Sequence, residues 1–169
     1  MTDNYSKADF QDEVRDLEHG IQKERESLDY FRETLDQMTG SSVQALYQWF
    51  VDYGQVHVSE LEAIHAEVTK EQVWSSGLEE RINATDSSVG ESPALEEQPR
   101  VKLDRSDLMS LRQAILHEKQ TASVYFTAVR RARNDHARAL WRYLARNTES
   151  HKNVLENTFD RLLKLALQK

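Results

Sequence analysis

Two glutamates and two histidines recur at one fixed interval in this 169-residue sequence: Glu24 and Glu118 lie 94 residues apart, and so do His57 and His151. Carboxylates and imidazoles are ligands that divalent first-row metals accept. A buried charge is costly unless it is paired, hydrogen-bonded or bound to a metal. If the four side chains meet inside the protein, they could hold one cation, or they could satisfy each other as two hydrogen-bonded Glu–His pairs.

Each of the four residues lies within the apolar face of a helical pattern, not opposite that face. The apolar residues three, four or seven positions away are Ile21 and Leu28 for Glu24, Ile115 and Ala122 for Glu118, Phe50 and Leu61 for His57, and Leu144 and Leu155 for His151. Because residues at these spacings share one side of a helix, we expect each of four helices to direct one ionisable group at a common interior.

The 94-residue interval also relates two longer segments, which align without a gap. Phe31 corresponds to Tyr125, and Tyr47 corresponds to Trp141. The two residues Gly40 and Ser41 correspond to Asn134 and Asp135, so both helical turns coincide. An internal repeat discloses architecture, and this one predicts two related helical hairpins.

The elements that must position these residues are four long helices in an all-α fold. Helical periodicity predicts one helix over residues 7–38 and a second that reaches residue 82, with Gly40 ending the first and a Ser41–Gln44 capping box starting the second. Residues 84–103 hold both prolines and predict a flexible crossover. Two further helices over 104–168 are expected to start at Asp104 or Ser106 and at Asn134–Asp135. We predict a single domain over 1–169, with hairpins at about 7–82 and 104–168.

Composition narrows the functional classes. The chain has a net charge of −7, which disfavours generic nucleic-acid binding. It has no cysteine, which excludes thiolate metal sites and Cys nucleophiles. Neither a secretory signal nor an apolar run of the ~20 residues that a membrane span needs is present, so a cytoplasmic location without membrane contact is predicted. A group of arginines runs against the overall charge and is interpreted as solvated helix faces, with an anionic partner as the alternative: Arg130, Arg131, Arg133, Arg138, Arg142 and Arg146.

The constellation resembles the rubrerythrin branch of the ferritin-like superfamily. Glu24 with Phe31 seven residues later, and Glu118 with Tyr125, are similar to that family's first-helix and third-helix motifs, and the match extends over all four helices. The resemblance implies a ferritin-like four-helix bundle of two antiparallel hairpins joined by a long crossover. It also implies metal ligands at Glu24, His57, Glu118 and His151, because in this family two helices supply a Glu and the other two a Glu-x-x-His pair.

The sequence departs from the family at the Glu of both Glu-x-x-His motifs, where Gly54 and Thr148 stand instead. Two carboxylates offset the charge of one divalent ion, so at most one Fe or Zn ion, or none, is predicted. An occupied iron site would allow oxidoreductase chemistry with an external electron donor, since the Cys-liganded iron domain of complete rubrerythrins is absent. Tyr53, one turn before His57, is a candidate to fill the space of the missing Glu.

The alternative hypothesis is a non-catalytic helical interaction or dimerisation module with a vestigial metal site. In the predicted second helix, aromatic residues cover a wider part of the circumference than one buried face requires: Tyr47, Trp49, Phe50 and Tyr53. A wide apolar face is normally covered, so this face predicts a homodimer. Replacing Glu118 by Gln should release an ion from a metal site but leave a hydrogen-bonded pair nearly as stable as before.

Overall fold

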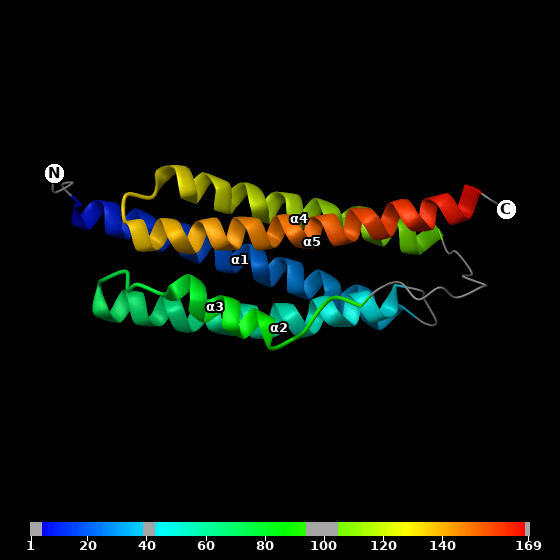
Figure 1. The fold of residues 1–169 in the computed structure, drawn as a ribbon, viewed down its shortest axis with the longest axis horizontal. Helices are drawn as coiled ribbons and strands as arrows, with labels where there is room; N and C mark the ends of the chain where they lie inside the picture. Colours follow the sequence, from blue (N-terminus) through cyan, green and yellow to red (C-terminus); the bar gives the residue numbers. More distant parts are fainter. Residues whose placement is uncertain (1–4, 39–42, 94–104, 168–169) are drawn as a thin grey trace.

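The computed structural model describes residues 5–38, 43–93 and 105–167, which fold as an all-α protein (Figure 1). Five helices pack against each other in this part of the chain. They are α1 (Lys7–Gln37), α2 (Gln44–Glu71), α3 (Leu78–Ser87), α4 (Arg105–Arg131) and α5 (Asp135–Leu167). None of these helices combines the length and the apolarity that crossing a membrane would require.

Polar side chains define two of the helix starts. Ser6 accepts a hydrogen bond from the Asp9 amide at 3.1 Å, while Asp9 accepts one from the Ser6 amide at 2.8 Å, which is a capping box at the start of α1. Asn134 accepts hydrogen bonds from the amides of His136 (2.9 Å) and Ala137 (3.2 Å). The predicted turn at Asn134–Asp135 is thereby confirmed.

The predicted caps of α2 and α4 are not found among the described residues. Val43 occupies the N-cap position of α2 and makes no side-chain cap, whereas the predicted Gly40 stop and Ser41 cap lie outside the described residues. Asp104 also lies outside them. Ser106 is the second residue of α4, inside the helix and not before it.

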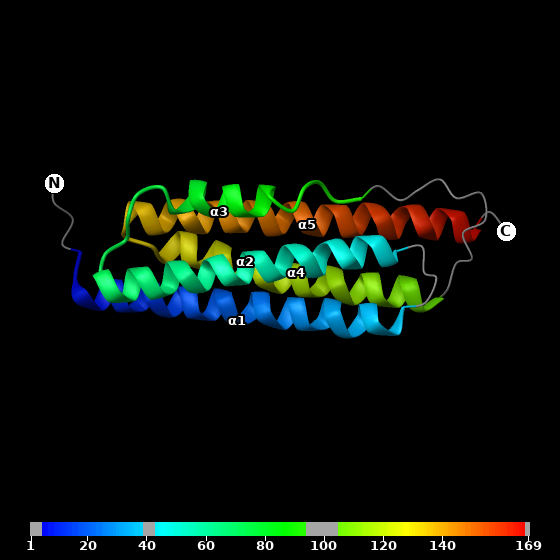
Figure 2. The same ribbon diagram turned by 90° about the horizontal axis from the view of Figure 1, so that it is seen from below.

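The helices form two antiparallel hairpins, α1–α2 (hairpin 1) and α4–α5 (hairpin 2), which lie side by side through α1 and α4 (Figures 1 and 2). The last residues of α1 and α4, Gln37 and Arg131, keep the 94-residue interval. α2 ends near the start of α1, whereas α4 begins at the opposite end of the molecule (Figure 1). The chain therefore returns along the length of the bundle between the two hairpins.

The predicted second helix is shorter than expected, and a separate helix follows it. α2 ends at Glu71, not at residue 82, because Gln72 and Gly77 adopt left-handed backbone conformations with φ of 52° and 80°. α3 then packs on α2 and α5 (Figure 2). Residues 84–87 of the predicted crossover are therefore helical, and its residues 94–103 lie outside the described part of the chain.

The core consists of two apolar clusters, one toward each end of the bundle. One cluster contains Leu17, Ile64, Trp74 and Trp141, and the other contains Phe31, Phe50 and Leu155, among others. The four predicted site residues lie between these clusters along their helices. The core therefore contains a polar layer near its middle.

Two close contacts hold the hairpins together. Gly20 on α1 approaches Tyr125 on α4 so closely that a Cβ atom there would stand 2.7 Å from the ring. Buried Glu13 accepts hydrogen bonds from the backbone amides of Arg133 (2.8 Å) and Asn134 (2.9 Å) and from the Tyr5 hydroxyl (2.6 Å). The Glu13 carboxylate of hairpin 1 thus accepts hydrogen bonds from backbone amides in the turn of hairpin 2, and these amides would otherwise lack partners.

Candidate functional site

The structure brings the four predicted residues together as two Glu–His pairs. His57 Nε2 lies 3.6 Å from Glu24 Oε1, and His151 Nδ1 lies 3.8 Å from Glu118 Oε2. His57, Glu118 and His151 are buried, and the Glu24 side chain keeps only 14% of its surface exposed. The expectation that four helices direct one ionisable group each at a common interior is confirmed.

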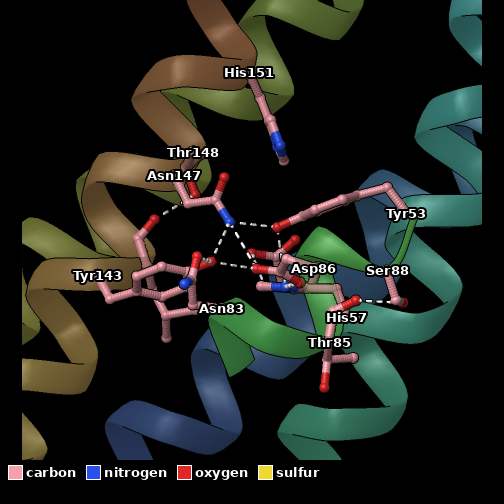
Figure 3. Close-up of polar contacts among 12 residues, drawn as sticks. Tyr53, His57, Asn83, Thr85, Asp86, Ser88, Tyr143, Asn147, Thr148 and His151 are labelled. Carbon is pink, nitrogen blue, oxygen red and sulfur yellow. Dashed lines mark hydrogen bonds and ion pairs between the residues drawn. The ribbon is translucent and has the colours of Figure 1, made fainter. Parts of the chain in front are cut away.

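A fifth ionisable residue, Asp86 on α3, completes the first pair (Figure 3). Its Oδ1 lies 2.7 Å from His57 Nδ1, on the side of the ring away from the Nε2 that faces Glu24. The Tyr53 hydroxyl lies 3.1 Å from the same Nδ1, and the two rings stack with centroids 5.1 Å apart. His57 is therefore held between two carboxylates from different helices.

The second oxygen of Asp86 joins α3 to α5. Tyr143 donates a hydrogen bond to Asp86 Oδ2 at 2.7 Å, and Asn147 donates one at 2.8 Å. Asn147 also donates to the Tyr53 hydroxyl on α2, so that this network joins side chains of α2, α3 and α5 (Figure 3). A buried polar network of this kind stabilises a unique packing only if its members are satisfied, and Asp86 is.

The first pair is charged. Burial by itself would raise the pKa of Glu24, but the attraction of His57 and a hydrogen bond from Tyr125 (2.8 Å) hold it below its usual value. Burial would lower the pKa of His57, yet Glu24 and Asp86 together raise it to about 10. The pKa of Asp86 is lowered against the effect of burial, chiefly by His57. At neutral pH one imidazolium lies between two carboxylates.

The second pair is neutral. Burial, reinforced by repulsion from Glu24, raises the pKa of Glu118 to about 8, and the hydroxyl of Ser27 (3.1 Å) only partly opposes this. Burial lowers the pKa of His151 to about 4. Its ring stands apart from the hydrogen bonds drawn in Figure 3 and meets aromatic rings nearly at right angles, those of Tyr53, Trp49 and Phe50, with centroids 4.4, 5.4 and 5.5 Å away.

The positions that would supply bridging glutamates do not fit a di-iron centre. A Cβ atom on Gly54 would stand 3.1 Å from Leu28 Cδ1, tighter than ordinary van der Waals contact. The Thr148 hydroxyl is turned back onto the Leu144 carbonyl oxygen at 2.9 Å. Across residues 5–38, 43–93 and 105–167, no three His, Cys, Asp or Glu side chains stand where they could hold a metal ion.

Sequence reasoning missed Asp86, Tyr143 and Asn147. Asp86 falls in the segment that was assigned to a flexible crossover, yet it follows buried Ile82 by four residues, as Ile82 follows Leu78. That spacing is the signal of a helix face and could have identified α3. The Tyr53 ring packs against both histidine rings. The atoms nearest to a Cβ on Gly54 belong to Leu28, however, so Tyr53 does not take the space next to Gly54 as expected.

The aromatic residues of α2 do not form a free face. Tyr47, Phe50 and Tyr53 are buried within the chain. Trp49 stacks on Tyr53 and donates its Nε1 hydrogen to the Gly90 carbonyl oxygen at 3.1 Å. The expectation of an outward dimer face here is wrong, because α5 and the segment after α3 cover it. The homodimer itself stays a prediction without this support.

Comparison with known proteins gives no relative: no family model, no curated protein and no solved structure matches the chain.

Proposed function

We propose that this chain is a metal-free, non-catalytic helical interaction module, in which the buried polar layer joins the two hairpins and α3 into one specific arrangement. The observation that carries this proposal is the position of His57 between Glu24 and Asp86. An imidazolium there offsets the charge of one of the two carboxylates and lies between them where a bound cation could otherwise lie, and both of its ring nitrogens already face a carboxylate.

The remaining charge of the polar layer also has partners. Two carboxylates and one imidazolium leave a single negative charge, because Glu118 and His151 are neutral at pH 7. Hydroxyl and amide donors from Tyr125, Tyr143 and Asn147 point at the two charged carboxylates. Buried ion pairs of this kind contribute more to a unique packing than to net stability in some proteins, and we propose that role for this layer.

A ferritin-like ancestry is part of the proposal. The 94-residue repeat, the paired hairpins and the return of the chain between α2 and α4 support it. In this view Gly54 and Thr148 replaced the bridging glutamates, and Asp86 and Tyr53 took over the contacts to the histidines. Iron-dependent oxidoreductase activity with an external electron donor has no support from this arrangement.

A single Fe or Zn ion remains the second candidate, favoured by one observation. Asp86 stands behind His57 as carboxylates stand behind the histidine ligands of many metal sites, where they fix the ring and its tautomer. In that arrangement His57 Nε2, which faces Glu24, would be the atom that binds the metal ion.

Metal analysis separates the two candidates. The chain is purified without chelator, and its iron and zinc content is measured by mass spectrometry. Thermal melting is then followed with EDTA, with Fe(II) and with Zn(II). We expect metal content well below one ion per chain and an unchanged Tm. One tightly bound ion per chain that raises Tm and is lost in Glu118→Gln would overturn the proposal in favour of the single-ion site. Two ions would restore the di-iron centre.

A further inference from the structure

A stripe of exposed side chains runs along the outer surface of α4 from residue 109 to residue 130. Its seven positions follow one another at intervals of three and four residues, which keeps them on one side of the helix. Apolar Met109, Leu116 and Phe126 are interleaved with basic side chains and one serine, and the stripe contains no acidic residue: the basic members are Arg112, Lys119 and Arg130. We call these positions the α4 stripe.

The apolar members of the α4 stripe are open to solvent. Met109 leaves 66% of its surface exposed, Leu116 45% and Phe126 43%. Removing apolar surface of this kind from water is favourable. The stripe therefore carries apolar area that the fold of this chain leaves uncovered.

The basic members of the α4 stripe keep their charge available. Arg112 and Arg130 form no ion pair within the described residues, and Arg130 donates only to the Thr127 hydroxyl (3.1 Å). Lys119 pairs with Glu156 of α5 at 3.4 Å, but both side chains are more than a third exposed. Exposed pairs are weak, so the stripe is a positively charged surface.

The internal repeat shows that the hairpin fold does not require this pattern. The equivalent positions of α1, from Arg15 to Asp36, hold three arginines, three acidic residues and one glutamine. Arg25 and Arg32 among them pair with acids of hairpin 1. The same face of a related helix is thus polar and free of net charge, so packing of the hairpins does not account for the apolar and basic residues on α4.

The two parts of the chain also carry opposite charge. Residues 5–93 contain seven Lys and Arg against nineteen Asp and Glu, whereas residues 105–167 contain twelve against six. An anionic surface would attract hairpin 2 and repel the acidic part formed by hairpin 1 and α3. The charge distribution therefore turns hairpin 2, with the α4 stripe, toward such a surface.

We propose that the α4 stripe binds an anionic membrane surface, with α4 lying parallel to the bilayer plane. The basic side chains would reach lipid phosphates and carboxylates while the apolar ones enter the boundary of the acyl chains, as in other helices that lie at this interface. A membrane is then the partner of the interaction module put forward above, and in that respect the contact rests on that function. Such a contact needs no membrane-spanning helix, and it departs from the prediction, made from the sequence, of a chain without membrane contact.

The order of residues in the α4 stripe favours a membrane over two other partners. A helix packed along it as in a coiled coil would need apolar residues at nearly every position, and it would instead bury Arg112 and Lys119 at a cost in desolvation. A nucleic acid would use the basic side chains but offers little to Met109 and Leu116. A lipid headgroup layer accepts both kinds of side chain along one line, because long basic side chains keep their charged ends in the polar region.

Vesicle sedimentation tests this contact. The full chain is mixed with vesicles of phosphatidylcholine alone or of phosphatidylcholine with phosphatidylserine. It should bind the mixed vesicles at low salt, leave them at high salt, and stay unbound with phosphatidylcholine alone. Arg112→Glu/Arg130→Glu should weaken binding by at least about thirtyfold, and Leu116→Ser/Phe126→Ser by about tenfold.

The matched control for the charge reversal is Arg15→Glu/Lys70→Glu, which makes the same change in net charge on exposed positions of hairpin 1. This control should bind the mixed vesicles nearly as tightly as the wild type. Circular dichroism melts establish that all variants are folded.

A fluorescent reporter locates the membrane-facing surface. The chain contains no cysteine, so a single cysteine can carry an environment-sensitive dye. The emission of the dye on Leu116→Cys should shift to shorter wavelength on the mixed vesicles. The dye on Gln22→Cys, the equivalent position of α1, should not shift.

The contact is overturned if the chain does not bind the mixed vesicles at low salt, if the dyes at positions 116 and 22 respond alike, or if a DNA duplex binds the chain more tightly than the vesicles do. These readouts are independent of metal content. A chain that holds an ion and still binds the vesicles through α4 would overturn the metal-free function and leave the contact standing, and a metal-free chain that binds no vesicles would do the opposite.

Discussion

The two halves of the polar layer contain the same pair of residues at the same positions of the repeat, yet they differ in charge. In hairpin 1, Glu24 and His57 are ionised. In hairpin 2, Glu118 and His151 are neutral at pH 7. Neither residue type nor helical position explains the difference, because both are shared. The ionisation of a buried group depends on the charges and hydrogen bonds that its neighbours provide.

Two neighbours account for the contrast. His57 has Asp86 on its second nitrogen, whereas the ring of His151 is enclosed by aromatic side chains. Glu24 receives a hydroxyl from Tyr125, whereas the repeat places Phe31, which has none, at the equivalent position for Glu118. A duplicated site can therefore diverge in electrostatics while its central residues stay unchanged.

Removing Asp86 should make the two halves of the polar layer alike. Of the substitutions considered, it should lower the free energy of unfolding the most. In Asp86→Ala the His57 imidazole loses one of its two carboxylates, and the donors of Tyr143 and Asn147 lose their acceptor. Breaking a buried ion pair on one side costs about 3–5 kcal/mol, and we expect that loss in the free energy of unfolding by urea titration. The pKa of His57, followed by NMR, should fall toward that of His151.

The matched control for this variant is Asp160→Ala, which changes an exposed acid on α5. A loss in Asp86→Ala no larger than in the control would mean that α3 does not stabilise the charged half.

Glu118→Gln should change how stability depends on pH. The folded pKa of Glu118 is about 8, above the 4.5 of an unperturbed glutamate, so the folded state binds the proton more tightly than the unfolded state. Its contribution to stability is therefore fully present below pH 4.5 and is lost as pH rises toward 8. Each pKa unit corresponds to about 1.4 kcal/mol. In urea titrations at pH 5 and pH 8, the free energy of unfolding of Glu118→Gln relative to that of the wild type should be higher at pH 8.

Exposed Glu33→Gln on α1 serves as the control and should keep the wild-type pH dependence. If Glu118→Gln and the wild type differ equally at both pH values, Glu118 is already ionised at pH 5 and the neutral half does not exist.

Exchanging the aromatic residues tests the second cause of the contrast and should have the smallest effect. Tyr125→Phe removes the hydroxyl from buried Glu24 and should cost about 1–2 kcal/mol. It should also raise the pKa of Glu24. Phe31→Tyr should lower the pKa of Glu118 by giving it the donor that its counterpart has. Both pKa values are measured by NMR of the side-chain carboxyls, and unchanged values would assign the contrast to Asp86 alone.

The central residues of this site could be predicted because the information is local. Glu24 and His57 fall in the phase of the apolar positions around them, and the repeat supplies Glu118 and His151 at the same phase. Helical periodicity is sufficient for such a statement. The same reasoning gives both hairpins and the turn at Asn134.

The parts that could not be predicted depend on contacts between distant segments. Asp86 reaches His57 only because α2 stops at Glu71 and the chain doubles back as α3, and that stop follows from the backbone of Gln72 and Gly77. The aromatic residues of α2 predicted an outer face, but His151 of α5 packs against Trp49, Phe50 and Tyr53, and the chain after α3 contacts Trp49. The ionisation states follow from these contacts and so were beyond the reach of pattern alone.

Gly20 sits in the interior of α1, where glycine disfavours a helix by about 1 kcal/mol relative to alanine. The ring of Tyr125 leaves no room for a methyl group at that position. Gly20 and Tyr125 are therefore expected to change together in evolution. A homologue with alanine at position 20 is expected to carry a smaller residue at 125, and with it a glutamate at 24 that has lost its hydroxyl donor.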